Sequence, residues 1–158
     1  MPVRFAIIAP RGLAVVRYEG HATVAEAGEA FGAYAMHPDA MPGQKQLIDL
    51  ADVTSFETDF ARLLALQAEK AAQFLAGGAQ TVMAYHAPDG ETYEMARLIR
   101  LSWADIPGIA VNVVAEEKHA LDILGQPEDT IDAVLSASGA TLLSAADHRM
   151  VLSRETEK

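Results

Sequence analysis

The sequence predicts an α/β domain with a mixed, mostly parallel sheet and helices packed against it. Five short apolar runs typical of strands occur at residues 3–9, 13–18, 47–50, 80–85 and 109–114. From the second run onward, segments with helical spacing separate each strand from the next, which indicates parallel pairing. Only a short turn joins the first two runs, which indicates an antiparallel hairpin. The predicted order is therefore ββαβαβαβα, followed by a C-terminal extension.

The chain opens with this hairpin and the first helix. Pro10-Arg11-Gly12 forms the turn between the two strands. Thr23-Val24-Ala25-Glu26 fits a capping box, in which the threonine side chain accepts a hydrogen bond from the third helical amide and the glutamate reaches back. His37-Pro38 ends the helix, because proline cannot continue it.

The stretch Gln46–Phe60, which reads QLIDLADVTSFETDF, combines a buried strand with a polar turn. A carboxylate inside an apolar strand needs a partner, so we expect Asp49 to accept hydrogen bonds from amides of the following turn. Ligands and partners gather at the carboxyl ends of strands in open α/β sheets. The sequence therefore predicts a partner-binding edge formed by Asp49, Thr54, Ser55, Glu57, Thr58 and Asp59. Helix capping accounts for the polar residues of the turn equally well.

The remaining elements repeat helix and strand. The second helix is predicted over residues 57–75 and the third over residues 91–105. The β-branched run at 109–114 is typical of a strand covered on both faces, and a short helix over 116–124 follows it. The predicted inner face of the second helix consists of Phe60, Leu64, Ala68, Ala71 and Leu75, and that of the third consists of Met95, Leu98, Ile99 and Ser102.

Residues 1–125 are predicted to form the domain and residues 126–158 an extension with further apolar side chains. These are Leu135, Leu142, Leu143, Met150, Val151 and Leu152. Burying one such side chain is favourable by roughly 1.5–3 kcal/mol, so the extension must cover its own chain or a second subunit. We expect a homodimer, the commonest oligomer.

Composition excludes several classes of function. A net charge of −10 argues against binding nucleic acid through a broad basic face. Because the chain has no cysteine, it has no disulfide and no thiolate metal site. The first apolar run is too short for a signal peptide or a membrane span, so a cytoplasmic location is expected.

No catalytic or cofactor-binding motif is present, so we expect no enzyme activity, cofactor or metal. The five histidines show no pairing at metal-ligand spacing. Tyr85 and His86 end a strand at the same edge as Asp49 and form a second candidate edge, for a ligand. A catalytic use of His86 with Asp49 is the weakest hypothesis, because no local proton-transfer partner is evident.

The element order and residues 48–60 together resemble the STAS family, in particular its SpoIIAA-like branch of anti-sigma-factor antagonists. Antagonists of that family carry Asp-Leu-Ser-Gly-Val and then Asp-Ser-Ser-Gly, whose second serine is the usual phosphate acceptor. Asp49, Leu50 and Val53 agree with the first motif. In the second motif, Glu57 takes the position of the aspartate and keeps an acidic side chain. Thr58 occupies the position of the first serine, Asp59 that of the second, and Phe60 that of the glycine. A carboxylate at the acceptor position cannot be phosphorylated, which leaves Thr58 as the substitute hydroxyl.

The resemblance implies a non-enzymatic regulatory or protein-interaction domain, with a kinase or another regulator as partner. The alternative is a domain that binds or senses a small apolar ligand or lipid between the sheet and its helices. The alanine-rich second helix allows either close packing or a pocket, and the sequence leaves both open.

Overall fold

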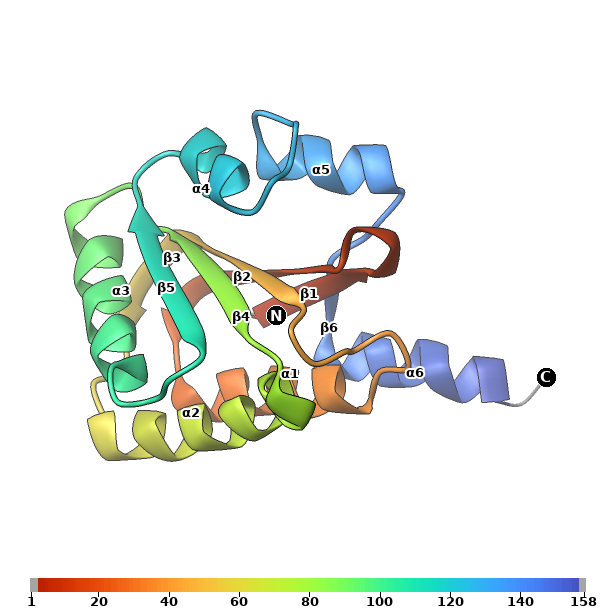
Figure 1. Cartoon of the computed structure of the whole chain (residues 1–158), viewed down its shortest axis with the longest axis horizontal. Coiled ribbons are helices and arrows are strands. Elements are labelled where there is room, and N and C mark those ends of the chain that lie inside the picture. The colour runs from red at the N-terminus through yellow and green to blue at the C-terminus, as the bar shows by residue number, and fades with distance from the viewer. Residues whose placement is uncertain (1–2, 157–158) are drawn as a thin grey trace.

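The computed structural model describes residues 3–156 and contains a six-stranded sheet in the order β5-β4-β3-β2-β1-β6 (Figure 1). The central strands β2 to β5 run parallel, whereas β1 pairs antiparallel with β2, and β6 antiparallel with β1. The predicted α/β class with a mostly parallel sheet is confirmed. The strands are β1 (Val3–Ile8), β2 (Leu13–Ala22), β3 (Lys45–Phe56), β4 (Thr81–His86), β5 (Ile109–Val114) and β6 (Leu143–Ser144).

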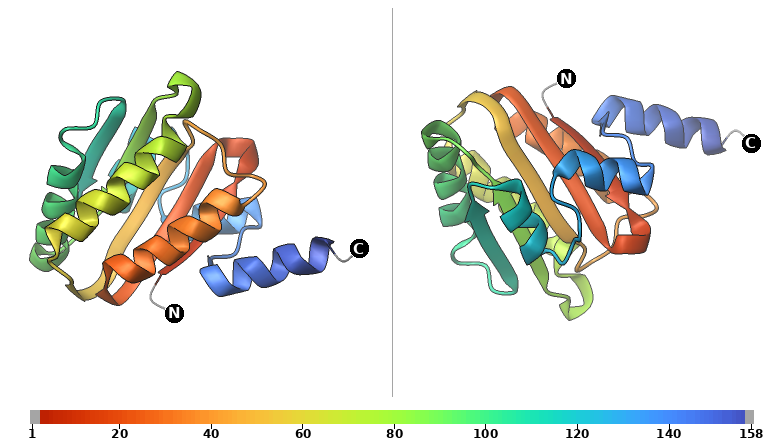
Figure 2. Two further views of the ribbon diagram at one scale, coloured as in Figure 1. Left: turned by 90° about the horizontal axis from the view of Figure 1, so that it is seen from below. Right: turned by 90° about the horizontal axis from the view of Figure 1, so that it is seen from above.

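The helices lie on both faces of this sheet (Figure 2). Right-handed crossovers that step in one direction along a sheet place their helices on one face, and β2 to β5 step in this way. That face carries α1 (Val24–Met36), α2 (Phe60–Phe74) and α3 (Gly90–Trp103). The opposite face carries α4 (Glu117–Ile123) and α5 (Ile131–Ser138), while α6 (Ala145–Thr156) lies beside α1.

The opposite face has its own apolar core, and the C-terminal extension is part of it. Leu13, Val15 and Leu47 of the sheet pack in one cluster with Ile131 and Val134 of α5, and all five are fully buried. Without α5 this part of the sheet would face water. The division predicted at residue 125 therefore separates segments that share a core.

The inner face of α2 differs from the prediction. The helix begins at Phe60, because β3 continues to Phe56. Its buried residues are Leu66, Gln67 and Phe74, whereas Leu64 is 42% exposed and Ala68 is also exposed. Ala71 and Leu75 of the predicted stripe do pack against the core as partly buried residues. The prediction is wrong for Leu64 and Ala68, because the polar residues Gln67 and Lys70 line the inner side of the helix and apolar spacing alone indicated a different stripe.

The strand β5 lies at the edge of the sheet, not in a fully covered position as predicted. Only Val114 in this strand is buried. The third helix agrees better with its prediction, since Met95 and Ser102 are buried. At α1 the threonine cap is confirmed, because Thr23 Oγ1 accepts from the Glu26 amide at 3.2 Å.

Most of the apolar residues of the extension are at least partly buried within the same chain. Leu135 and Leu142 are buried, and Leu143 and Leu152 are half-buried. Met150 and Val151 on α6 remain 54% and 42% exposed. The homodimer stays a prediction, and its contact is now expected on this part of α6.

Replacement of Leu66 by alanine tests the observed phase of α2. We expect the free energy of unfolding to fall by about 2–5 kcal/mol, because a buried leucine is lost. Leu64→Ala is the matched control on the exposed side and should change it by less than about 0.5 kcal/mol. Urea denaturation measures both. A larger loss for Leu64→Ala than for Leu66→Ala would contradict the observed packing.

Charges on α6 test the homodimer. We expect the double variant Met150→Glu/Val151→Glu to be monomeric by light scattering at tens of micromolar, since charged residues are depleted at interface cores. Leu101→Glu, on the exposed side of α3, is the control and should leave the mass unchanged. A wild-type protein that is already monomeric rules out the dimer. Deletion of residues 127–158 is a poorer test, because it removes α5 from the core.

Candidate functional site

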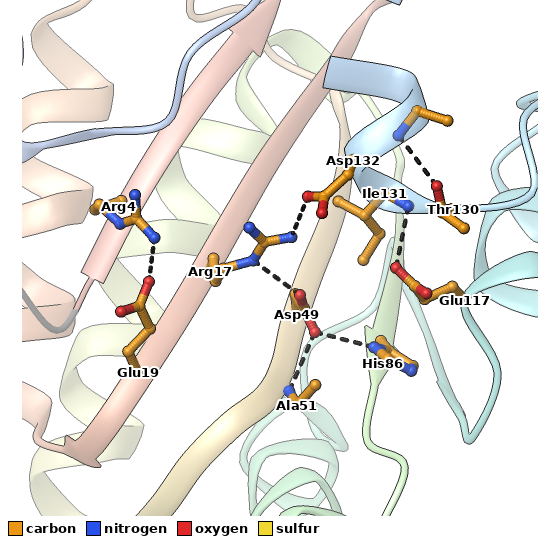
Figure 3. Close-up of polar contacts among 11 residues, drawn as sticks. Arg4, Arg17, Glu19, Asp49, Ala51, His86, Glu117, Thr130, Ile131 and Asp132 are labelled. Carbon is orange, nitrogen blue, oxygen red and sulfur yellow. Dashed lines mark hydrogen bonds and ion pairs between the residues drawn. The ribbon is translucent and has the colours of Figure 1, made fainter. Parts of the chain in front are cut away.

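Three charged side chains lie side by side on three neighbouring strands (Figure 3). In the parallel register, Arg17 of β2 is opposite Asp49 of β3, and Asp49 is opposite His86 of β4. Alternate residues of a strand face opposite sides of a sheet, and this row faces the side covered by α4 and α5. Asp49 and His86 therefore meet, as their shared edge suggested.

Asp49 is 4% exposed, and both of its carboxylate oxygens have partners. Oδ2 accepts from Arg17 Nε at 2.9 Å. Oδ1 accepts from His86 Nδ1 at 2.9 Å and from the Ala51 amide at 3.1 Å. The expected bonds to amides of a following turn are therefore replaced by a bond to an amide of the same strand, because β3 continues past Ala51. Burial alone would raise the pKa of Asp49, but the hydrogen bonds from His86, Ala51 and Arg17 outweigh it and lower the pKa below its usual value.

The environment of His86 favours the protonated ring. Its hydrogen bond to Asp49 raises its pKa against the opposing effect of burial, and the negative charges of Asp49 and Glu117 and the Ala115 carbonyl act in the same direction. Both oxygens of Asp49 already accept hydrogen bonds. The row is therefore a buried hydrogen-bonded network of Arg17, Asp49 and His86.

The network also holds the start of α5 (Figure 3). Arg17 Nη2 donates to Asp132 Oδ1 at 3.1 Å. Next to it, Glu117 Oε1 accepts from the Ile131 amide at 3.1 Å, and Thr130 caps the same helix. Helix amides at this end have no intrahelical partners, so these contacts anchor the helix over the sheet.

The junction between β3 and α2 lies apart from this network. Thr54 and Ser55 belong to the strand, and Ser55 Oγ lies 2.7 Å from His21 Nδ1. Asp59 is the cap of α2 and accepts from the Arg62 amide at 3.2 Å, which confirms the capping interpretation for this residue. The predicted partner-binding set is thus split.

Its other members divide in the same way. Glu57 pairs with Arg62 at 3.2 Å, and Thr58 is exposed. Asp49 is buried under α4 and α5 and cannot reach a partner at this surface. Only the residues from Thr54 to Asp59 remain together as a candidate contact surface.

Tyr85 faces the side opposite to His86, where a cavity lies between the sheet and helices α1 to α3. The cavity has a volume of about 100 Å³. Val16, Ile48 and Tyr85 are neighbours across three strands and line it from the sheet. Ala27 and Ala30 line it from α1, and their small side chains leave the space open.

Three polar residues that line this cavity have a side-chain group without a hydrogen bond or ion pair in the described part of the chain. Gln67 is 1% exposed, and its Oε1 has no hydrogen bond in the described part of the chain. Lys70 forms no ion pair among residues 3–156, and burial lowers its pKa to about 8. Burial raises the pKa of the Tyr18 hydroxyl, which has no hydrogen bond there either, to about 12.

Sequence analysis missed all three of these residues. A signal was available for two of them, because Leu63, Leu66, Gln67, Lys70 and Phe74 follow one another at helical spacing. Polar residues within such a stripe indicate either that another side of the helix is buried or that these residues line a cavity. Here they mark a cavity.

No protein-family model matches the chain, and no curated protein matches it significantly. The resemblance to the STAS family stays a prediction from residues 48–60 and the element order. Among residues 3–156, no three histidine, aspartate or glutamate side chains are grouped to hold a metal ion. None of the helices in that range is long and apolar enough to cross a bilayer.

Replacement of Asp49 by asparagine tests the ion network. We expect the free energy of unfolding at pH 6 to fall by about 3–5 kcal/mol, because His86 and Arg17 lose a buried partner. Asp52→Asn, an exposed change on the same strand, is the control and should stay within about 0.5 kcal/mol. Equal losses for the two variants would show that the network contributes nothing specific.

The contribution of the ion network to stability also depends on pH, and comparing the wild type with Asp49→Asn measures this dependence. The raised pKa of His86 contributes stability that is complete below its ordinary value of 6.5 and is lost as pH rises through the folded value. The lowered pKa of Asp49 contributes stability that is complete above 3.8 and is lost as pH falls through the folded value. Urea titrations above pH 6.5 should therefore show declining stability for the wild type and a weaker decline for Asp49→Asn.

Proposed function

We propose that the chain is a non-enzymatic binding domain that takes up a small apolar molecule between its sheet and helices α1 to α3. The cavity of about 100 Å³ carries this proposal. Protein interiors pack as densely as organic crystals and contain few voids larger than water. An apolar cavity of roughly 150 Å³ stays dry and binds benzene or xenon, so the smaller space here suits a ligand smaller than benzene.

The polar residues of the wall support binding over a packing defect. A buried polar group without a hydrogen bond destabilises a fold by about 1–3 kcal/mol. Leucine at position 67 would avoid this loss, yet the chain keeps Gln67 there and Lys70 one turn later. Unpaired groups in an otherwise apolar pocket are typical of sites that orient a ligand.

A second candidate function is regulation of a protein partner at the junction between β3 and α2. Phe56 and Glu57 line the cavity, and the exposed residues Thr58 and Asp59 follow them directly. A ligand that moves Phe56 would therefore alter this surface. The resemblance to anti-sigma-factor antagonists supports a kinase or another regulator as partner, with Asp59 in place of the phosphorylated serine.

Filling the cavity tests the first proposal. We expect xenon, a probe smaller than benzene, to shift the amide NMR signals of cavity residues in the wild type and to shift none in Ala30→Met, whose longer side chain occupies the space. Ala35→Met is the matched control, because Ala35 lies on the exposed side of the same helix. Native mass spectrometry of the purified protein adds a search for a retained ligand. Xenon shifts of equal size in Ala30→Met would place binding elsewhere.

A further inference from the structure

The C-terminal half of α6 projects beyond the rest of the fold (Figures 1 and 2). The first half is held to the sheet, because Ala145 and His148 are buried and His148 Nε2 donates to the Phe5 carbonyl at 2.7 Å. From residue 149 to residue 155, Leu152 is half-buried and the other side chains are exposed. Helices of about 12 residues are marginal in water unless they pack against something. Contacts within one chain therefore stabilise mainly the first half of α6.

The exposed side of α6 carries a stripe with an apolar centre and opposite charges at its ends. Residues three, four and seven positions apart share one face of a helix, and here they are the exposed residues Asp147, Met150, Val151 and Arg154. Neither charged residue of the stripe forms an ion pair with another of residues 3–156. The residues of α6 that contact the body of the protein lie on a different side of the helix.

This stripe is complementary to a reversed copy of itself. Asp147 precedes Met150 by three residues, and Arg154 follows Val151 by three residues. In an antiparallel pair of α6 helices, Met150 of each copy therefore meets Val151 of the other. Asp147 of each copy then lies beside Arg154 of the other. A two-fold interface needs such self-complementarity, because every contact in it occurs twice.

We infer that two copies of the chain associate through antiparallel α6 helices related by a two-fold axis between Met150 and Val151. This inference goes beyond the expected homodimer, because it fixes how the two copies meet. A parallel pair would instead place each Asp147 beside its own copy. The pair is independent of ligand binding, since no residue of α6 lines the cavity.

A membrane surface suits the stripe less well than a second copy does. Helices that lie on membranes are typically rich in lysine and arginine, which attract anionic lipid. The stripe has one charge of each sign, and the chain as a whole carries a net charge of −10. Opposite charges at equal distances from the centre favour a partner with the same pattern in reverse.

Charge reversals test the antiparallel pair. Asp147→Lys and Arg154→Glu each place like charges side by side at both ends of the stripe. We expect each variant alone to raise the dimer dissociation constant about tenfold in analytical ultracentrifugation. An equimolar mixture of the two variants should regain the association of the wild type, because each chain supplies the charge that the other has lost. Glu155→Lys, an exposed reversal beside the stripe, is the matched control and should change the constant by less than about twofold.

Cross-linking decides the question if a charge reversal fails to fold. Because the chain has no cysteine, Val151→Cys carries a single thiol, placed next to the two-fold axis. Mild oxidation should join two copies of this variant by a disulfide. Ala146→Cys, an exposed change on the same helix, is the control and should stay unlinked, because its two copies lie about 13 Å apart along the helix axis.

Three results would overturn the inference. The first is a wild-type protein that is monomeric at tens of micromolar. The second is a mixture of the two charge variants that associates no better than either variant alone. The third is equal cross-linking of Val151→Cys and Ala146→Cys, which would indicate a parallel or unspecific contact.

Discussion

The right-handed crossovers between β2, β3, β4 and β5 decide which face of the sheet each helix covers. Because all three crossovers step in one direction, α1, α2 and α3 share one face. The other face then depends on residues that follow β5. α4 and α5 supply this cover, and Arg17 of the row beneath them adds one ion pair to α5, through Asp132.

Because successive residues of a strand face opposite sides, the sheet has a charged row on one side and a cavity on the other. Asp49 and His86 face α4 and α5, while their neighbours Ile48 and Tyr85 face the cavity. The charged row has every oxygen of its central carboxylate engaged, so its contribution is to stability. The cavity face has groups left unsatisfied. The proposed function therefore uses the less charged side of the sheet.

On the inner face of α2 the proposed function and the stability of the fold oppose each other. Gln67 and Lys70 weaken the apolar stripe that would pack best against the sheet, and the alanines of α1 leave space opposite them. Each of these choices lowers the stability of the empty protein. Together they produce a pocket with directional groups, which a close-packed core cannot offer.

The sequence by itself determined the element order, the hairpin, the cap at Thr23 and the α/β class, because these depend on local spacing and turn chemistry. Part of the candidate site also followed, since the sequence placed Asp49 and His86 at one edge of neighbouring strands, although β3 in fact continues past Asp49 to Phe56. Only the tertiary structure decided that these two pair across 37 residues of chain, because register between strands is not a local property. The tertiary structure also decided which side of α2 is buried. Gln67 and Lys70 face inward, so the buried side cannot be read from apolar spacing and depends on the surface that the helix packs against.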